Sequence, residues 1–174
     1  MPLAADLTKV ADELTKGGGK IPLPVFAKMA EQVSKAFSVK ADEVAILSLM
    51  EGDKFLKFVI PEKFQQVGNL PMTSTTSLAV RTAREKRPEV INNFTTAKHT
   101  TVFEAIPLGK ERGEPIQKIM SAPITVEGKI TGVIQVSRKG KSVAAVGPDF
   151  TPKDLSELVA AGGQIGRCLK ILES

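Results

Sequence analysis

The chain has very few of the residues that build metal centres and disulfides. It contains one cysteine, one histidine and no tryptophan or tyrosine among 174 residues. A single thiol rules out an intramolecular disulfide, and one cysteine with one histidine cannot form a Cys/His zinc site. No apolar run approaches the roughly 20 residues of a membrane-spanning helix. We therefore expect no metal, no cofactor and no membrane contact.

The rest of the composition is that of an ordinary globular protein. The hydrophobic fraction is 42% and the charged fraction is 25%, and the length suits one domain with a real core. The opening segment MPLAADLTKVADELTK carries acids early and no apolar block, so it is not a secretory signal. These properties predict a cytoplasmic protein.

Positive charge exceeds negative charge only modestly. The formal net charge is +5, with local concentrations of Lys and Arg in residues 81–87 and 138–141. Such charge permits loose contact with nucleic acid, but the usual role of scattered basic residues is to solvate the surface. Specific nucleic-acid binding is therefore not expected, and a basic nucleic-acid-associated regulator is only the third hypothesis.

Apolar spacing predicts two helices before the first strand. A narrow helical seam, followed by three glycines, is formed by Leu3, Leu7, Val10 and Leu14. We assign residues 1–20 to this helix and its glycine-rich linker, and residues 21–174 to one domain. Pro24 opens the second helix. Its wide apolar stripe is read as core rather than as a cofactor site, and consists of Phe26, Met29, Ala30, Val33 and Phe37.

Two β-hairpins are predicted to bracket the middle of the chain. Residues 44–50 and 55–60 form the first, and residues 116–126 and 129–137 form the second around a Glu-Gly turn. Between them, residues 77–86 predict a short helix, which is followed by a brief strand. In the last strand Ile130, Ile134 and Val136 should share one face, with Val133 on the other. Apolar residues on both faces indicate a central strand.

The final helix begins at Pro152, with Thr151 as its N-cap and Asp154 in its first turn. Its apolar seam alternates spacings of three and four residues through Leu155, Leu158, Gly162, Ile165, Leu169 and Leu172. The seam either lies across the protein's own sheet or pairs with a second copy, and we expect a homodimer. Each helical glycine costs about 1 kcal/mol relative to alanine, so their presence favours close approach of another backbone.

This order of elements resembles that of a GAF domain, a family of small sensory and regulatory modules. The resemblance is carried by the segments SLAVRTAREKRPEVINNF and MSAPITVEGKITGVIQV, and by the Phe150-x-x-x-Asp154 spacing. It implies an α+β fold of the GAF/PAS-like type, in which a central antiparallel sheet carries the N- and C-terminal helices on one face. The chain is thus similar to a small stand-alone member of the family.

Family ligands lie over one sheet face, beneath the irregular segment between the hairpins. The resemblance therefore places a small-molecule pocket at Asn92, Asn93, Thr95, His99, Thr101 and Phe103. Cyclic-nucleotide-binding members have an Asn-Lys pair and a Glu where this chain has residues 137–139 and Leu155, which argues against that ligand. Some members bind haem through a histidine, but His99 stands in a polar loop and is read as a surface residue.

No catalytic arrangement is visible in the sequence. The free methionine sulfoxide reductases share this fold and use several cysteines, whereas Cys168 has no resolving partner. We therefore expect a non-catalytic sensory or regulatory module. It would sense a small molecule or contact a signalling protein, and would act through a helix-mediated homodimer. The alternative is a structural or protein-interaction module whose pocket is empty or filled by its own side chains.

Overall fold

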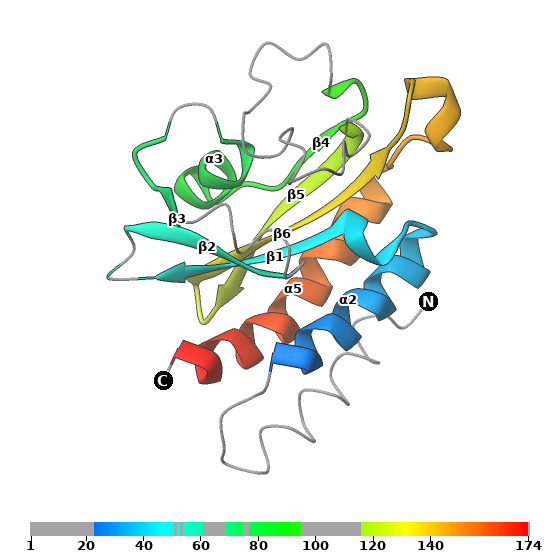
Figure 1. Cartoon of the computed structure of the whole chain (residues 1–174). Helices are drawn as coiled ribbons and strands as arrows, with labels where there is room; N and C mark the ends of the chain where they lie inside the picture. Colours follow the sequence, from blue (N-terminus) through cyan, green and yellow to red (C-terminus); the bar gives the residue numbers. More distant parts are fainter. Residues whose placement is uncertain are drawn as a thin grey trace.

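The computed structural model describes residues 23–50, 52, 54–60, 69–74, 77–94 and 116–173. In these residues six antiparallel strands form one sheet in the order β3-β2-β1-β6-β5-β4. Helices α2 (Leu23–Phe37) and α5 (Pro152–Glu173) lie on one face, and α3 (Leu78–Glu85) lies on the other (Figure 1). The α+β prediction with both terminal helices on one face is confirmed. The helix and linker expected in residues 1–20 lie outside the described residues.

Both predicted hairpins are present. The first joins β1 (Val44–Met50) to β2 (Phe55–Ile60), and the second joins β5 (Ile116–Val126) to β6 (Lys129–Lys139). The brief strand β4 (Glu89–Ile91) pairs with β5, and β6 is central between β1 and β5 as expected. The edge strand β3 (Asn69–Pro71) was not predicted, because three residues are too few to show an alternation.

Apolar side chains are buried on both faces of the sheet. On the α2 and α5 face, the whole predicted stripe of α2 is at most 5% exposed and packs against β1 and β2. On the other face, apolar residues of α3 pack against β1 and β6. Burial on both faces explains why these strands read as nearly continuous apolar runs rather than as an alternation.

One residue of β6 faces the side opposite to the predicted one. Ile130 packs beneath α3 together with Val133, rather than with the residues that face α2 and α5. In the pairing with β5, Gly132 lies opposite Ile124 and Ile130 lies opposite Thr125, so one residue between them is bulged. An extra residue in a strand reverses the alternation beyond it. The prediction for Ile130 was wrong for this reason.

The start of α5 is fixed by a capping box. The backbone N–H of Thr151 donates to Asp154 Oδ2 at 2.9 Å, and the N–H of Asp154 donates to Thr151 Oγ1 at 3.1 Å. This exchange satisfies two N–H groups that have no partner within the helix, and Pro152 as the first helical residue needs none. The predicted start of the last helix is confirmed.

The apolar seam of α5 lies against the protein's own sheet. Three members of the seam are completely buried, namely Leu158, Ile165 and Leu169. They share one core with residues of β5 and β6. A Cβ added to Gly162 would lie 3.6 Å from Ile124 Cγ1, and Leu155 is partly buried against the same core. For Leu172 the structure describes the helical backbone but not the side chain. The intramolecular interpretation accounts for these contacts.

Two glycines of α5 have different surroundings, which gives a matched pair of substitutions. A Cβ at Gly163 would meet nothing within 4 Å, whereas one at Gly166 would lie 2.7 Å from Val126 Cγ2 and 2.8 Å from Ile124 Cγ2. We expect Gly163→Ala to raise the free energy of unfolding by about 0.5–1 kcal/mol through helix propensity. Gly166→Ala should lower it by about 1–3 kcal/mol through overpacking. Urea titrations check both values, and effects of the same sign would contradict this packing.

Candidate functional site

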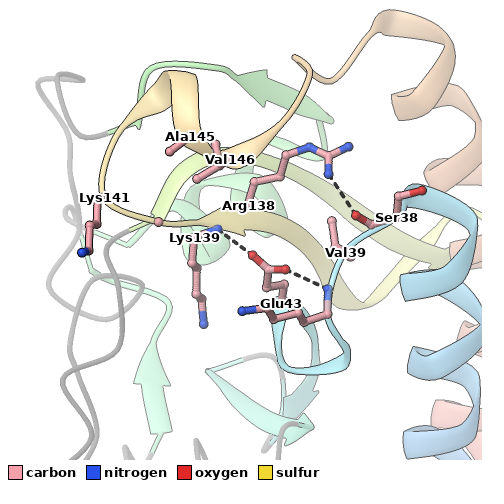
Figure 2. Close-up of a pocket in the computed structure, with 10 residues that line it drawn as sticks. Ser38, Val39, Glu43, Arg138, Lys139, Lys141, Ala145 and Val146 are labelled. Carbon is pink, nitrogen blue, oxygen red and sulfur yellow. Dashed lines mark hydrogen bonds between the residues drawn. The ribbon is translucent and has the colours of Figure 1, made fainter.

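A hollow of about 590 Å³ opens at the end of the sheet where β6 leaves it (Figure 2). One wall is formed by the end of α2 and the short 3₁₀ helix η1 (Ala41–Glu43). The other wall is formed by the end of β6 and the segment that continues into the 3₁₀ helix η4 (Val143–Val146). The charged side chains of the lining are Lys40, Glu43, Arg138, Lys139 and Lys141.

The end of α2 turns the chain into this hollow. Ser38 has a positive φ of 56°. The Val39 N–H donates to the Ser34 carbonyl at 2.9 Å, and the Ser38 N–H donates to the Lys35 carbonyl at 3.4 Å. These bonds form a Schellman motif with serine at the position that glycine usually occupies. The motif leaves the carbonyls of Phe37 and Ser38 available to an outside donor.

Arg138 supplies that donor from β6. Its Nη2 donates to the Phe37 carbonyl at 3.1 Å, its Nη1 donates to the Ser38 carbonyl at 3.2 Å, and its guanidinium lies 4.6 Å from the ring centroid of Phe150. Arg138 is 9% exposed. Desolvation lowers the pKa of Arg138, and the carboxylates of Glu43 and Asp154 act in the opposite direction. The side chain thus joins α2, β6 and the start of α5.

Glu43 crosses the floor of the hollow from η1. Its Oε1 accepts the backbone N–H of Lys40 at 2.7 Å, and its Oε2 accepts the backbone N–H of Lys139 at 2.6 Å (Figure 2). Glu43 is buried, and these two backbone N–H bonds offset the cost of removing its carboxylate oxygens from water. Glu43 therefore fastens η1 to the end of β6.

A buried lysine holds the second wall in place. Lys118 Nζ donates to the Gly147 carbonyl at 2.7 Å and lies 2.7 Å from Asp149 Oδ1. Beside it, Gln117 Nε2 donates to the Gly140 carbonyl at 2.9 Å. Both bonds tie the segment after β6 to β5. The hollow is therefore built from fixed walls rather than from a loose surface loop.

Arg138→Met is expected to lower the free energy of unfolding by about 2–4 kcal/mol, because two charge-assisted bonds and the contact with Phe150 are lost. Arg84→Met is the matched control, since Arg84 also donates to two carbonyls, those of Met72 and Ser74, but is exposed. Its loss should stay below about 1 kcal/mol. Denaturant unfolding measures the free energy of unfolding of both variants. Equal losses would contradict the structural role of Arg138.

A buried polar cluster lies on the opposite face of the sheet, beneath α3. The cluster consists of Thr82 on α3, Ser121 on β5 and Gln135 on β6, all at most 4% exposed. The hydroxyls of Thr82 and Ser121 lie 2.6 Å apart, and Gln135 Nε2 donates to Ser121 Oγ at 3.2 Å. Its neighbours on this face include apolar side chains such as Ile119 and Val133, and also Glu89, which lies opposite Ser121 and forms a salt bridge with Arg81 of α3. Hydrogen bonding within the cluster offsets the cost of burying its polar groups.

The structure describes two of the six residues predicted to bind a ligand. Asn92 Nδ2 donates to the Phe150 carbonyl at 3.1 Å, and Asn92 Oδ1 accepts the Phe150 N–H at 2.9 Å. The Asn92 amide therefore fastens the end of β4 to the start of α5. Asn93 is exposed. The other four predicted residues lie outside the described part of the chain, namely Thr95, His99, Thr101 and Phe103.

The sequence did contain a signal for the polar cluster. Ser121 and Gln135 stand in the strand segments 119–124 and 133–136, whose other residues are apolar on both faces, so they are expected to be covered as well. Polar residues on a doubly covered strand are candidates for specific recognition, whereas they are ordinary on a solvent-facing one. The contact with Thr82 could not be found in this way, because it depends on where α3 docks.

Cys168 is buried in the core between α5 and the sheet. Burial raises the pKa of its thiol, with a smaller opposing effect of Arg167. The described residues include no group of three or more His, Cys, Asp or Glu placed to hold a metal ion. Across the same residues, no helix combines the length and the apolar character that a membrane span demands.

A family model described as a GAF domain matches residues 25–170. The chain therefore belongs to the GAF domain family, and is a module of the sensory and regulatory kind found in signalling proteins. The GAF domain of an Acinetobacter phosphoenolpyruvate-protein phosphotransferase matches with a TM-score of 0.65 and 16% identity, covering 98% of this chain and 94% of that one. A comparison with curated proteins gives no match.

Two solved enzymes share the fold as well. Free methionine-R-sulfoxide reductase from Neisseria meningitidis, in complex with its substrate, matches with a TM-score of 0.66 and 10% identity, covering 98% of this chain and 87% of that one. The type II enzyme from Thermoplasma acidophilum matches with a TM-score of 0.59 and 14% identity, covering 87% of this chain and 98% of that one.

These two reductases correct the expectation of a non-catalytic protein. That expectation was drawn from the regulatory members of the family and from the single cysteine. The reductases are enzymes built on the same fold, so the fold does not separate sensors from catalysts. The prediction of a non-catalytic protein was therefore wrong, because membership of this family does not exclude catalysis. The burial of Cys168 bears only on the reactivity of that thiol, and says nothing about catalysis by other side chains.

Proposed function

We propose that this GAF domain recognises a small polar molecule on the α3 face of its sheet. The observation that carries the proposal is the buried cluster of Thr82, Ser121 and Gln135. Small-molecule sites are mostly apolar and hold a few fixed polar groups that orient the ligand. The cluster supplies such groups on a face where α3 and the sheet also bury many apolar side chains. The hydrogen bonds that now join its members are the ones that a ligand would replace.

The two central strands offer a physical route from this face to the terminal helices. Ser121 and Gln135 face α3, whereas their neighbours Ala122 and Ile134 face the core under α2 and α5. A ligand that binds one arrangement of α3 better than another shifts the equilibrium between them by its difference in affinity. Movement of β5 and β6 would then change how α5 meets a signalling protein or a second copy of the chain.

A second candidate function follows from the contacts within the cluster. The Thr82 and Ser121 hydroxyls are 2.6 Å apart, and Gln135 donates to the same serine, so the polar groups already satisfy one another. This favours a structural or protein-interaction module whose pocket is filled by its own side chains. In that case the cluster fixes α3 on the sheet and has no ligand.

A thermal-shift screen against nucleotides, amino acids and small carboxylates separates the two candidates. A ligand of this face should raise the melting temperature of the wild type, and Ser121→Ala or Gln135→Leu should abolish that shift. Ser34→Ala is the control, because Ser34 is a buried serine on α2, where its hydroxyl donates to the Glu31 carbonyl at 2.7 Å. Shifts that persist in the cluster variants would contradict the site, and a screen without any stabilising compound would favour the second candidate.

A further inference from the structure

The hollow beside Glu43 carries a concentration of positive charge. Lys40, Arg138, Lys139 and Lys141 line it together with one carboxylate. That carboxylate offsets one of the four positive charges, and its oxygens accept backbone N–H groups rather than lysine ammonium groups. In the described part of the chain, neither Lys40 nor Lys141 forms a salt bridge with a carboxylate. The hollow is therefore a concave cationic surface.

Arg138 gives this surface a rigid centre. Its terminal nitrogens are held by the two carbonyls at the end of α2, and Phe150 covers its plane. Within the described residues, its buried Nε has no hydrogen-bond acceptor. Buried donors are nearly always paired, so the unpaired Nε leaves the positive charge of this guanidinium only partly offset by acceptors.

The C-terminal end of a helix ordinarily repels anions, because its free carbonyls carry partial negative charge. At α2 that effect is reduced, since Arg138 donates to the carbonyls of Phe37 and Ser38. The Schellman motif accounts for the N–H groups of Ser38 and Val39 and directs the chain away from the helix axis. The end of α2 is thus compatible with a negative ligand.

We propose that this hollow binds a small phosphate-bearing anion. Several ammonium groups around a concave surface suit a multiply charged group better than a single carboxylate, because each lysine acts as a point charge. The walls are fixed by Glu43, Gln117 and Lys118, so the backbone that carries the cations is held in place without a ligand. The site lies at the end of the sheet and does not depend on the polar cluster beneath α3.

Titration of the full chain with inorganic pyrophosphate at low salt tests this site. We expect saturable binding of one equivalent by calorimetry, with the backbone amide of Gly140 shifting in NMR spectra. The double variant K139Q/K141Q should weaken binding about tenfold or more, since bonds to charged groups are lost. The control K57Q/K129Q makes the same change in net charge on exposed lysines, one of which starts β6 at the end opposite the hollow. It should change the affinity less than about twofold.

Three results would overturn the proposal. The first is equal weakening by both double variants, which would indicate diffuse attraction to net charge. The second is the absence of saturation. The third is duplex DNA binding more tightly than pyrophosphate and losing that affinity in K139Q/K141Q, which would assign the surface to nucleic acid. Melting temperatures equal to that of the wild type establish that each variant is folded.

Discussion

Gly132→Ala is expected to lower the free energy of unfolding by about 3 kcal/mol or more. A Cβ at this position would overlap the carbonyl oxygen of Leu47 on β1 and would lie 3.1 Å from Leu169 Cδ1 on α5. The first obstacle is backbone, so relief requires β1 and β6 to separate at the centre of the sheet. Urea unfolding followed by circular dichroism measures the loss.

Gly163→Ala is the control for this substitution, because it makes the same chemical change where an added Cβ meets nothing within 4 Å. The two variants should therefore move the unfolding midpoint in opposite directions. A loss below about 1 kcal/mol for Gly132→Ala would show that the backbones of β1 and β6 are further apart than described. The structure contains both a bulge beside Gly132 and a close approach of the β1 backbone to it.

Leu158→Asp is expected to unfold the chain or to lower its stability by about 4 kcal/mol or more. Leu158 is completely buried under the sheet, so the change removes an apolar side chain and places a carboxylate in the core. Val159→Asp is the matched control, since its side chain is 39% exposed on the adjoining position of α5. Its stability should stay within about 0.5 kcal/mol of the wild type.

The same two variants test the homodimer, which stays a prediction. Light scattering at high concentration gives the oligomeric state, and circular dichroism shows whether each variant is folded. If α5 pairs with a second copy, the contact must use its exposed side, and Val159→Asp should weaken it without unfolding the chain. A folded, monomeric Leu158→Asp would instead support the intermolecular seam and contradict the described packing.

Local sequence patterns were sufficient for most of the fold. The stripe of α2, both hairpins and the capped start of α5 each depend on residues close together in the chain, so spacing and turn chemistry reveal them. Ile130 was misplaced because a bulge is not visible in alternation. The heptad-like seam of α5 was ambiguous, since covering a sheet and pairing helices require the same spacing.

The candidate sites were much less accessible from sequence. Glu43 and Arg138 are far apart in the chain, and their partners are backbone groups, which leave no trace in residue type. Asn92 was read as a ligand-binding residue, but its amide completes two bonds with the Phe150 backbone. A polar side chain near a predicted pocket can hydrogen-bond to backbone groups as readily as to a ligand. Only the packing of distant segments decides between these roles.

A ligand that contacts the polar cluster beneath α3 should change the environment of the Gln135 side chain. The most direct measurement follows the side-chain amide signals of Gln135 and Asn92 by NMR during titration with any compound that stabilises the protein. The Gln135 signals should move with saturation while those of Asn92, which is bonded to the Phe150 backbone, stay in place. A stabilising compound that leaves the Gln135 signals unmoved at saturation would contradict the proposed site.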